Sequence, residues 1–408
     1  MSDPVSDPVS DIWDLVVVGA GPAGSCAALG ALKASPGLRV LLLDRADFPR
    51  DKSCGDGIAP HVLDALATVG ATDAVAGWTP LRHLELARGG ARVAGPMRRE
   101  VYVVPREVFD ARLVGHAVAA GAVLQKRRVR RVEVREDVVV LDGELSARVV
   151  VGADGVHSVL RPHLLGDDRE PRAIAIRGYA PTAEARRGTQ VIRYGPRAQP
   201  AYAWAFDRGD GMSNVGYGEL LPGPSRGPVP SRALLLEQLE ELLPGTVPDG
   251  RDWKGHHLPL SGWRWKQPDG RVLLVGDAAA LVNPMTGEGI YYAVATGLSA
   301  GRTAARCLTS GDPGRAGAEH RRAVRGLLGR HLKHTWTAAR LARVPAVVDA
   351  GIRAADRDRH AFDSLVELGL GDGRIGPRLA SGLARQLPRS FSPFRHDLEE
   401  PHADPVRP

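Results

Sequence analysis

The chain has 408 residues, of which 43% are hydrophobic and 25% are charged. This is an ordinary globular composition, and the length allows more than one domain. The net charge of +7 suits an anionic cofactor or an anionic lipid surface, but it does not by itself indicate nucleic acid, and we expect no such partner. The three scattered cysteines argue against a disulfide framework, the histidines show no metal spacing, and we expect no metal site.

The N-terminus and the hydropathy pattern indicate where the protein works. The first residues repeat Ser-Asp-Pro-Val and lack the basic and apolar regions of a signal peptide, which predicts a disordered leader at 1–11. No uninterrupted apolar stretch is long enough to span a bilayer. With so few cysteines, this favours a cytoplasmic protein.

A dinucleotide-binding unit follows the leader. A run of β-branched residues at 14–18 predicts a buried parallel strand, and the Ala/Leu-rich segment 25–34 predicts a helix. Between them, Gly19-x-Gly21-x-x-Gly24 has the spacing of a tight turn, a close backbone approach to a pyrophosphate, and close packing of helix on strand. The second strand, at 39–43, ends in Asp44, about 20 positions after the last glycine, where an acid accepts a ribose hydroxyl.

The rest of the chain repeats the pattern of a buried strand that runs into a polar turn. Strands at 147–151 and 271–275 lead into Gly152-Ala153-Asp154-Gly155 and Gly276-Asp277, the second at the start of a helix. The patterns also predict short strands at 81–104, a hairpin at 126–140, a β-rich region at 173–262, and helices near 62–69, 105–113, 232–243 and from about 316 onward.

This order predicts an α/β (α+β) protein. One Rossmann-like nucleotide-binding domain would be assembled from residues 12–80, 101–170 and 264–305. A β-rich substrate domain, an antiparallel β-sheet formed by residues 81–100 and 171–263, would be inserted into it, and residues 306–408 would form a C-terminal helical region and tail. Ligands would then lie at the carboxyl ends of the parallel strands, where the three polar turns converge.

Taken together, these motifs resemble the FAD-dependent enzymes of the p-hydroxybenzoate hydroxylase fold and, more narrowly, the geranylgeranyl reductase family. The resemblance covers roughly residues 12–305 and rests on three further stretches. They are Phe48-Pro49-Arg50-x-Lys52-x-Cys54-Gly55-Asp56-Gly57, Tyr202-x-Trp204-x-Phe206, and the turn Asn283-Pro284-x-Thr286-Gly287-Glu288-Gly289-Ile290. Two prolines of the family's aromatic motif are replaced, by Gln199 and Asp207. These departures affect the prediction of the substrate more than the prediction of flavin binding.

The resemblance implies most of the candidate site. The residues implied to bind FAD are Gly19, Gly21, Pro22, Ala23, Gly24, Asp44, Arg45, Cys54, Gly55, Arg106, Asp154, Gly155, Gly276, Asp277, Pro284, Gly287, Gly289 and Ile290. The turn around Gly287 would donate N–H groups to the N1/O2 side of the flavin, where the reduced ring gathers negative charge. The implied catalytic residues are Cys54, Tyr202 and Trp204.

Cys54 corresponds to the proposed proton donor of the resembling reductases. The reference pKa of a thiol, about 8.5, leaves it protonated near neutral pH, although Lys52 could lower that value and give a reactive thiolate. Alternatively, Cys54 is a small residue in a tightly packed loop. Tyr202, Trp204 and Phe206 could likewise be one buried face of a strand.

The first functional hypothesis is an FAD-dependent oxidoreductase that reduces C=C bonds of a prenyl substrate by flavin hydride transfer. No second GxGxxG unit is visible, so the electron donor would be transiently bound NAD(P)H or a ferredoxin-like protein. The alternatives are a flavin monooxygenase or halogenase that acts on a small natural product, and a non-catalytic carrier of prenylated ligands. Halogenases of this fold carry Gly-Glu-Ser where this chain has Cys54-Gly55-Asp56, which favours the reductase.

A basic amphipathic helix is expected at 315–343, where many arginines accompany the single acid Glu319. Such a helix either lies on an anionic membrane or packs on the flavin domain with its arginines solvated. We therefore expect a small-molecule or lipid substrate, with peripheral membrane association as an open alternative. The sequence leaves the substrate, the donor and the oligomeric state open.

Overall fold

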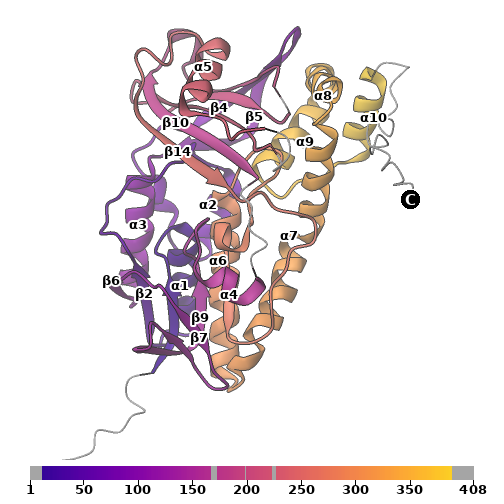
Figure 1. The fold of residues 1–408 in the computed structure, drawn as a ribbon. Helices are drawn as coiled ribbons and strands as arrows, with labels where there is room; N and C mark the ends of the chain where they lie inside the picture. The colour runs from indigo at the N-terminus through magenta and orange to yellow at the C-terminus, as the bar shows by residue number, and fades with distance from the viewer. Residues whose placement is uncertain (1–11, 167–171, 198, 223–226, 388–408) are drawn as a thin grey trace, which may run out of the picture.

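The computed structural model describes residues 12–166, 172–197, 199–222 and 227–387. The expected leader at 1–11 and the end of the expected tail, from residue 388, lie outside these residues. The described chain forms two sheets, one in the lower half of Figure 1 and one in the upper half. A long helix, α7 (Ala316–Leu341), runs from the lower half toward the upper sheet, as both views show.

The lower sheet has a parallel centre made from distant parts of the chain. Its order is β6-β2-β1-β9-β8-β7, and β15 also pairs with β9. In β1 (Trp13–Val18) and β9 (Leu145–Gly152), Val17 pairs with Val151, and β15 (Val272–Leu274) extends the parallel pairing on the far side of β9. The other strands are β2 (Val40–Asp44), β6 (Val123–Lys126), β7 (Val132–Val134) and β8 (Val139–Leu141). Apolar runs buried on both faces make this centre, as parallel strands require.

Helices α1 (Pro22–Ala34) and α6 (Ile290–Thr309) pack closely against each other beside the lower sheet. The contact depends on glycines, because a Cβ at Gly297 would lie 2.2 Å from the Ala23 oxygen, and one at Gly301 would lie 2.0 Å from the Ala27 oxygen. The other helical segments near this sheet are α2 (Pro60–Ala67), η2 (Thr72–Val75), α3 (Arg106–Ala119), α4 (Leu160–Leu165), η4 (Gly276–Ala279) and η5 (Pro313–Arg315).

The upper sheet has the order β14-β10-β13-β12-β11-β4-β5-β3 and is antiparallel except where β11 runs parallel to β4. Its strands are β3 (Gly57–Ile58), β4 (Leu81–Arg88), β5 (Ala91–Val103), β10 (Ala173–Pro181), β11 (Thr189–Tyr194), β12 (Tyr202–Asp207), β13 (Met212–Leu220) and β14 (Arg251–Leu258). Helix α5 (Arg232–Leu242) packs on Ala203 and Ala205 of β12, and the short helix η3 (Glu184–Arg186) precedes β11. Since strand residues alternate between faces, Tyr202, Trp204 and Phe206 lie on the face away from α5.

Three expected elements differ from the observed ones. The strands between residues 81 and 104 are not short, because β4 and β5 form one long hairpin around Gly89-Gly90. The hairpin accommodates Pro96 where the pairing shifts register between Leu81 and His83. The hairpin expected at 126–140 lies at 132–141, since residues 123–126 join the parallel edge as β6. After residue 275 the chain makes only a short 3₁₀ turn, and the long helix begins at Ile290.

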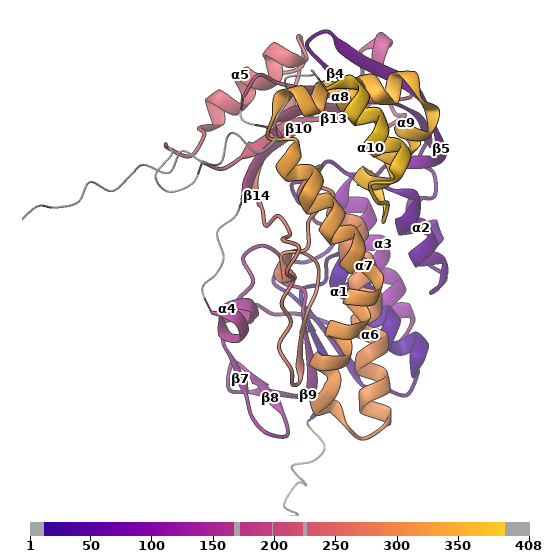
Figure 2. The ribbon, with the colours of Figure 1, turned by 90° about the vertical axis from the view of Figure 1, so that its right-hand side faces the viewer.

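The C-terminal helices cover the remaining side of the upper sheet. After α7, the helices α8 (Pro345–Arg357) and α9 (Arg359–Leu370) lie beside the β4–β5 hairpin, and α10 (Pro377–Gln386) packs on α8 and α9 (Figure 2). The apolar residues Val324, Leu328 and Leu332 of α7 are buried in the core, whereas Leu327 is exposed. Most of the apolar face of α7 is therefore used for packing within the protein. In the described part of the chain, no helix combines the length and the apolar character needed to cross a membrane.

Candidate active site

A largely apolar cavity of about 340 Å³ lies between the two sheets and the C-terminal helices. At one end it is lined by the cysteine loop, β12 and the turn at 284–290. At the other it is lined by α8, α9 and α10. Fourteen of the predicted site residues line it: Gly21, Pro22, Ala23, Cys54, Gly55, Arg106, Gly155, Tyr202, Trp204, Asp277, Pro284, Gly287, Gly289 and Ile290. The structure does not place Gly19, Gly24, Asp44, Arg45, Asp154 and Gly276 in the lining.

The glycine-rich turn is shaped by close backbone contacts. Gly19 has a φ of 101°, and a Cβ there would lie 2.3 Å from the Ala153 oxygen, so this turn fits against the Asp154 turn. At Gly24 a Cβ would lie 1.7 Å from the Gly19 oxygen. Gly21 caps α1 without any side-chain cap hydrogen bond. The helix therefore presents its N-terminal N–H groups at the cavity, which is the arrangement of an anion site.

Cationic side chains surround this helix terminus. A Cβ at Gly21 would lie 3.6 Å from an Arg50 nitrogen and 3.9 Å from an Arg106 nitrogen. Arg106 is buried and forms a two-bond pair with Asp110, at 2.6 and 2.8 Å, while Arg50 lies 3.2 Å from the same carboxylate. Although burial opposes the charge, Asp110 raises the pKa of Arg106, so the guanidinium stays charged.

The acidic residues that end the parallel strands occupy different settings. Asp44 accepts hydrogen bonds at 2.9 Å from the N–H groups of Ala20 and of Ala46, which fixes it beside the glycine-rich turn. Asp154 accepts from the Val159 N–H at 2.7 Å. Its buried Oδ1 has no hydrogen-bond partner among the described residues. Burial raises the pKa of Asp154. Asp277 lines the cavity, and its Oδ2 lies 3.5 Å from Lys52 Nζ.

Cys54 lies in the cavity wall next to Arg106 and is partly buried. Burial raises the pKa of its thiol, and Arg106 offsets only part of that effect. Lys52, which could have favoured a thiolate, is ion-paired with Asp277 instead. The thiol is therefore protonated near neutral pH and can act as an acid.

The aromatic residues of β12 form one wall of the cavity. Tyr202 donates a hydrogen bond to the Thr286 carbonyl, and its ring centroid lies 5.8 Å from that of Tyr194 and 6.1 Å from that of Trp204. The indole of Trp204 donates to Asn214 Oδ1 at 2.8 Å. The alternation seen in the sequence thus marks a buried face, and that face is also the cavity wall.

Glu288 and His256 line the cavity but were not among the predicted site residues. Burial raises the pKa of Glu288 to about 7, although its Oε1 accepts from the Tyr291 N–H at 2.9 Å. Burial, with Lys52 nearby, lowers the pKa of His256 to about 4. Glu288 stands inside a glycine-rich turn motif, which was the only signal for it. His256 on β14 carried no signal, because its exposure to the cavity depends on distant strands.

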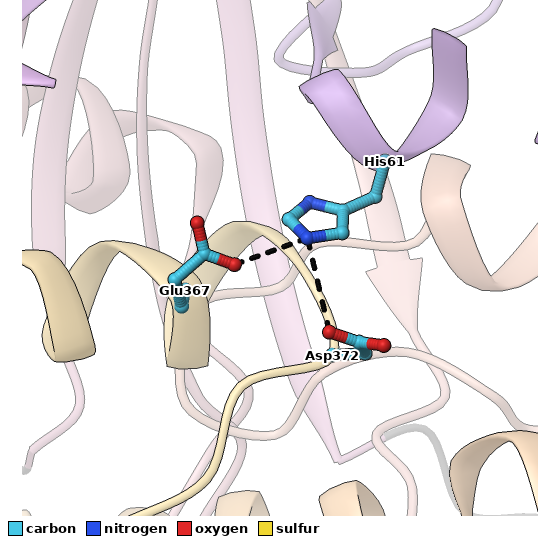
Figure 3. Close-up of side chains that lie close together, drawn as sticks. All are labelled: His61, Glu367 and Asp372. Carbon is cyan, nitrogen blue, oxygen red and sulfur yellow. Dashed lines mark ion pairs between the residues drawn. The ribbon is translucent and has the colours of Figure 1, made fainter. Parts of the chain in front are cut away.

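A polar cluster outside the cavity joins α2 to α9 and to Asp372, two residues after the end of α9. His61 Nε2 lies 3.0 Å from Glu367 Oε2 and 3.8 Å from Asp372 Oδ1 (Figure 3). The hydrogen bond to Glu367 raises the pKa of His61. The backbone is close here, since a Cβ at Gly371 would lie 2.3 Å from the imidazole. This cluster fastens the C-terminal helices to the lower half of the molecule.

Comparison with known proteins agrees with this geometry. A family described as FAD binding domain matches residues 13–191. The menaquinone reductase of Mycolicibacterium smegmatis is 35% identical over 325 residues, 73% of this chain and 76% of that protein. The digeranylgeranylglycerophospholipid reductase 1 of Methanopyrus kandleri is 34% identical over 327 residues, 74% of this chain and 82% of that protein. The chain belongs to the geranylgeranyl reductase family of FAD-dependent oxidoreductases.

Solved structures show the same fold. A geranylgeranyl bacteriochlorophyll reductase-like protein from Thermoplasma acidophilum superposes with a TM-score of 0.72 at 20% identity, covering 93% of this chain and 97% of that one. A flavin-dependent halogenase gives a TM-score of 0.62 at 19% identity, covering 92% and 70%. At these identities the structural likeness concerns the fold alone. As a member of the geranylgeranyl reductase family, the protein is an enzyme that uses FAD.

The residues present suit FAD. The uncapped terminus of α1 and the nearby Arg50 and Arg106 suit a pyrophosphate. Asp44 lies at the end of β2, where an acid accepts ribose hydroxyls. The orphaned Oδ1 of Asp154 is a buried acceptor that lacks a donor among the described residues, which a bound cofactor or a water molecule would supply.

Proposed function

We propose that the protein reduces C=C bonds of a prenyl chain with FAD. The observation that carries this proposal is the single cavity that joins the cysteine loop to the apolar C-terminal helices. Its distal lining includes Val348, Ile352, Leu365, Val366, Leu379 and Leu383. Burial of an isoprenoid chain against such residues is favourable, because it removes apolar surface from water. The names of the two reductase relatives support a prenylated substrate.

The cofactor would lie along the carboxyl ends of the parallel strands. We assign its pyrophosphate to Gly19, Gly21, Pro22, Ala23 and Gly24, with Arg106 beside them. Its adenosine ribose belongs with Asp44 and Arg45, and its ribityl chain with Gly276 and Asp277. We assign the remaining contacts with FAD to Cys54, Gly55, Asp154, Gly155, Pro284, Gly287, Gly289 and Ile290. When bound and reduced, FAD supplies the hydride of the reaction.

The chain itself supplies the proton and the orientation. Reduction of a C=C bond requires a hydride on one carbon and a proton on its neighbour. We assign the proton to the Cys54 thiol, which lines the cavity and whose raised pKa keeps it protonated. Tyr202 and Trp204 would hold the chain against the wall opposite the C-terminal helices. The electrons would come from NAD(P)H or a ferredoxin-like protein, with which the sequence is equally compatible.

A lipid substrate needs a route to the cavity. Leu341, at the end of α7, lines the cavity and is also 36% exposed, and we therefore propose that the cavity opens near the junction of α7 and α8. We propose that this region approaches an anionic membrane peripherally, helped by the basic residues of α7. Co-sedimentation with anionic vesicles at low salt should carry the holoenzyme down. Failure to bind such vesicles would leave α7 as a packing helix only.

The proposed function is tested by product analysis. The holoenzyme is reduced anaerobically and incubated with a menaquinone or a geranylgeranylated glycerophospholipid. Products are then analysed by mass spectrometry. We expect the substrate to gain two hydrogen atoms for each reduced double bond. Incorporation of oxygen or halide in aerated samples, with no hydrogenation under anaerobic conditions, would instead identify an oxygenase or halogenase.

A further inference from the structure

A buried amide joins the cysteine loop to the aromatic wall of the cavity. Asn214 of β13 is fully buried, and its Nδ2 donates to the Cys54 carbonyl at 2.9 Å and to Asp56 Oδ2 at 2.8 Å. Its Oδ1 accepts from the Trp204 indole at 2.8 Å. The Asn214 side chain thus uses its N–H donors on the cysteine loop and its oxygen on Trp204. It connects Cys54 and Trp204, the two residues assigned to the reaction.

The orientation of this amide is determined by its partners. An indole N–H can only donate, and a backbone carbonyl can only accept. The Asn214 oxygen must therefore face Trp204, and its nitrogen must face Cys54. Neither aspartate nor leucine can reproduce the arrangement. An ionised aspartate has no donor for the Cys54 carbonyl and would place a second carboxylate against Asp56, and leucine satisfies none of the three groups.

Further polar contacts hold the same loop from the neighbouring strand. Asp56, with a φ of 59°, accepts from the Tyr179 hydroxyl at 2.6 Å. The buried Arg177 lies over the Tyr179 ring, pairs with Asp51 and donates to the Lys52 carbonyl at 3.1 Å. The loop is therefore anchored before and after Cys54. In the described part of the chain, only Asn214 forms hydrogen bonds with both Cys54 and Trp204.

We propose that Asn214 is a positioning residue, which fixes the backbone of Cys54 relative to Trp204 so that the thiol faces the chain held against the aromatic wall. The inference rests on the proposed function of Cys54. Without the Asn214 amide, the protein would keep the Cys54 thiol and would still bind FAD, but the thiol would be displaced. It would then no longer deliver its proton to the reacting carbon from the productive distance. The effect belongs to the proton-transfer step and leaves the reduction of the flavin unchanged.

The test compares Asn214→Leu and Asn214→Asp with the wild-type holoenzyme. Asn214→Asp keeps the acceptor for Trp204 and loses the donor for Cys54, so it remains informative if the leucine variant does not fold. The matched control is Gln267→Leu, which removes another buried amide. Its partners are the Pro268 and Val272 carbonyls and the Leu274 N–H, away from the cysteine loop. Four quantities are measured: FAD content, flavin reduction rate, prenyl reduction rate, and the pH profile of Cys54 alkylation read by peptide mass.

We expect both Asn214 variants to retain FAD and to reduce it at the wild-type rate. Prenyl reduction should fall about tenfold, and the pH profile of Cys54 alkylation should shift, whereas Gln267→Leu changes neither. Combining Asn214→Leu with Cys54→Ala should lower the rate no further than Cys54→Ala alone, because both act on one step.

Three results separate the positioning proposal from the proposed function. Wild-type alkylation and turnover in folded, FAD-containing Asn214 variants would overturn the positioning role. Multiplicative loss in the double variant would do the same. If Cys54→Ala keeps full activity while the Asn214 variants still change Cys54 alkylation, the proton-donor role fails and Asn214 remains the residue that orders the loop.

Discussion

At the scale of single residues, Cys54 combines cavity access with a thiol that stays protonated. Burial raises its pKa, so the acid form dominates at neutral pH. Replacing it with alanine or serine should leave FAD binding and flavin reduction intact, while prenyl reduction falls at least about tenfold, or ~1.4 kcal/mol of transition-state stabilisation. Turnover is compared with FAD content in each variant. Near-wild-type turnover in both would remove Cys54 from the mechanism.

Glu288 predicts a pH dependence of stability. Its folded-state pKa of about 7 lies above the ordinary glutamate value of about 4.3, because burial disfavours the carboxylate. The folded protein therefore keeps a proton that the unfolded chain loses, and stability falls as pH rises from about 4.3 through about 7. Glu288→Gln, which mimics the protonated form, should lose less stability than wild type between pH 5 and pH 8 in urea unfolding. Parallel pH profiles would contradict the shifted pKa.

Single residues differ in how far the sequence could reveal them. Cys54 and Trp204 stand in recognisable local motifs, so their candidacy needed no structure. Asn214 could not be found this way, because its bond to Cys54 joins positions 160 apart in the chain. The raised pKa of Glu288 is equally hidden, since it results from burial by segments that only the fold brings together.

At the scale of elements, the contact between α1 and α6 depends on glycines, which have no side chain. A Cβ at Gly301 would lie 2.0 Å from the Ala27 oxygen, a backbone atom that cannot move away cheaply. Gly301→Ala should lower the free energy of unfolding by about 1–3 kcal/mol. Gly326 of α7 is the control, because a Cβ there meets nothing within 4 Å. Gly326→Ala should stabilise the protein by ~0.5–1 kcal/mol. Equal effects in urea unfolding would argue against the close contact.

The His61 cluster predicts a pH-sensitive attachment of α9 (Figure 3). Hydrogen bonding to Glu367 raises the His61 pKa above its ordinary value of about 6.5. This stabilisation is complete below about pH 6.5 and is lost as pH rises through the folded-state pKa. Amide exchange in α9 should therefore accelerate more from pH 6 to pH 8 in wild type than in His61→Gln. The opposite order would rule out an ion pair at this position.

The elements themselves were largely predictable where periodicity and turn residues agree. The strand–glycine–helix unit at the N-terminus and the helix near residue 232 correspond to β1, α1 and α5. The length of the β4–β5 hairpin was not predictable, because Pro96 suggests a break and only the local register shift accommodates it. The length of this hairpin is therefore determined by strand pairing in the folded protein and not by the local sequence.

At the scale of the whole molecule, the cavity is built by segments from almost the entire described chain. The sequence indicated a nucleotide-binding fold with an inserted sheet, and the family resemblance indicated FAD. It did not indicate that α8, α9 and α10 would complete the apolar end of the cavity. Amphipathic helices reveal that they bury a face, but not what they bury it against. The match between the end that we assign to the flavin and an apolar end became visible only in three dimensions.

The central claim is that electrons pass from the reduced flavin to a prenyl double bond. The most direct measurement mixes prereduced holoenzyme with a prenyl lipid under strictly anaerobic conditions and follows flavin absorbance together with product mass. We expect the oxidised flavin spectrum to return, with one double bond saturated for each flavin reoxidised. A flavin that stays reduced with every prenyl lipid offered, and is reoxidised only when oxygen enters, would contradict the claim.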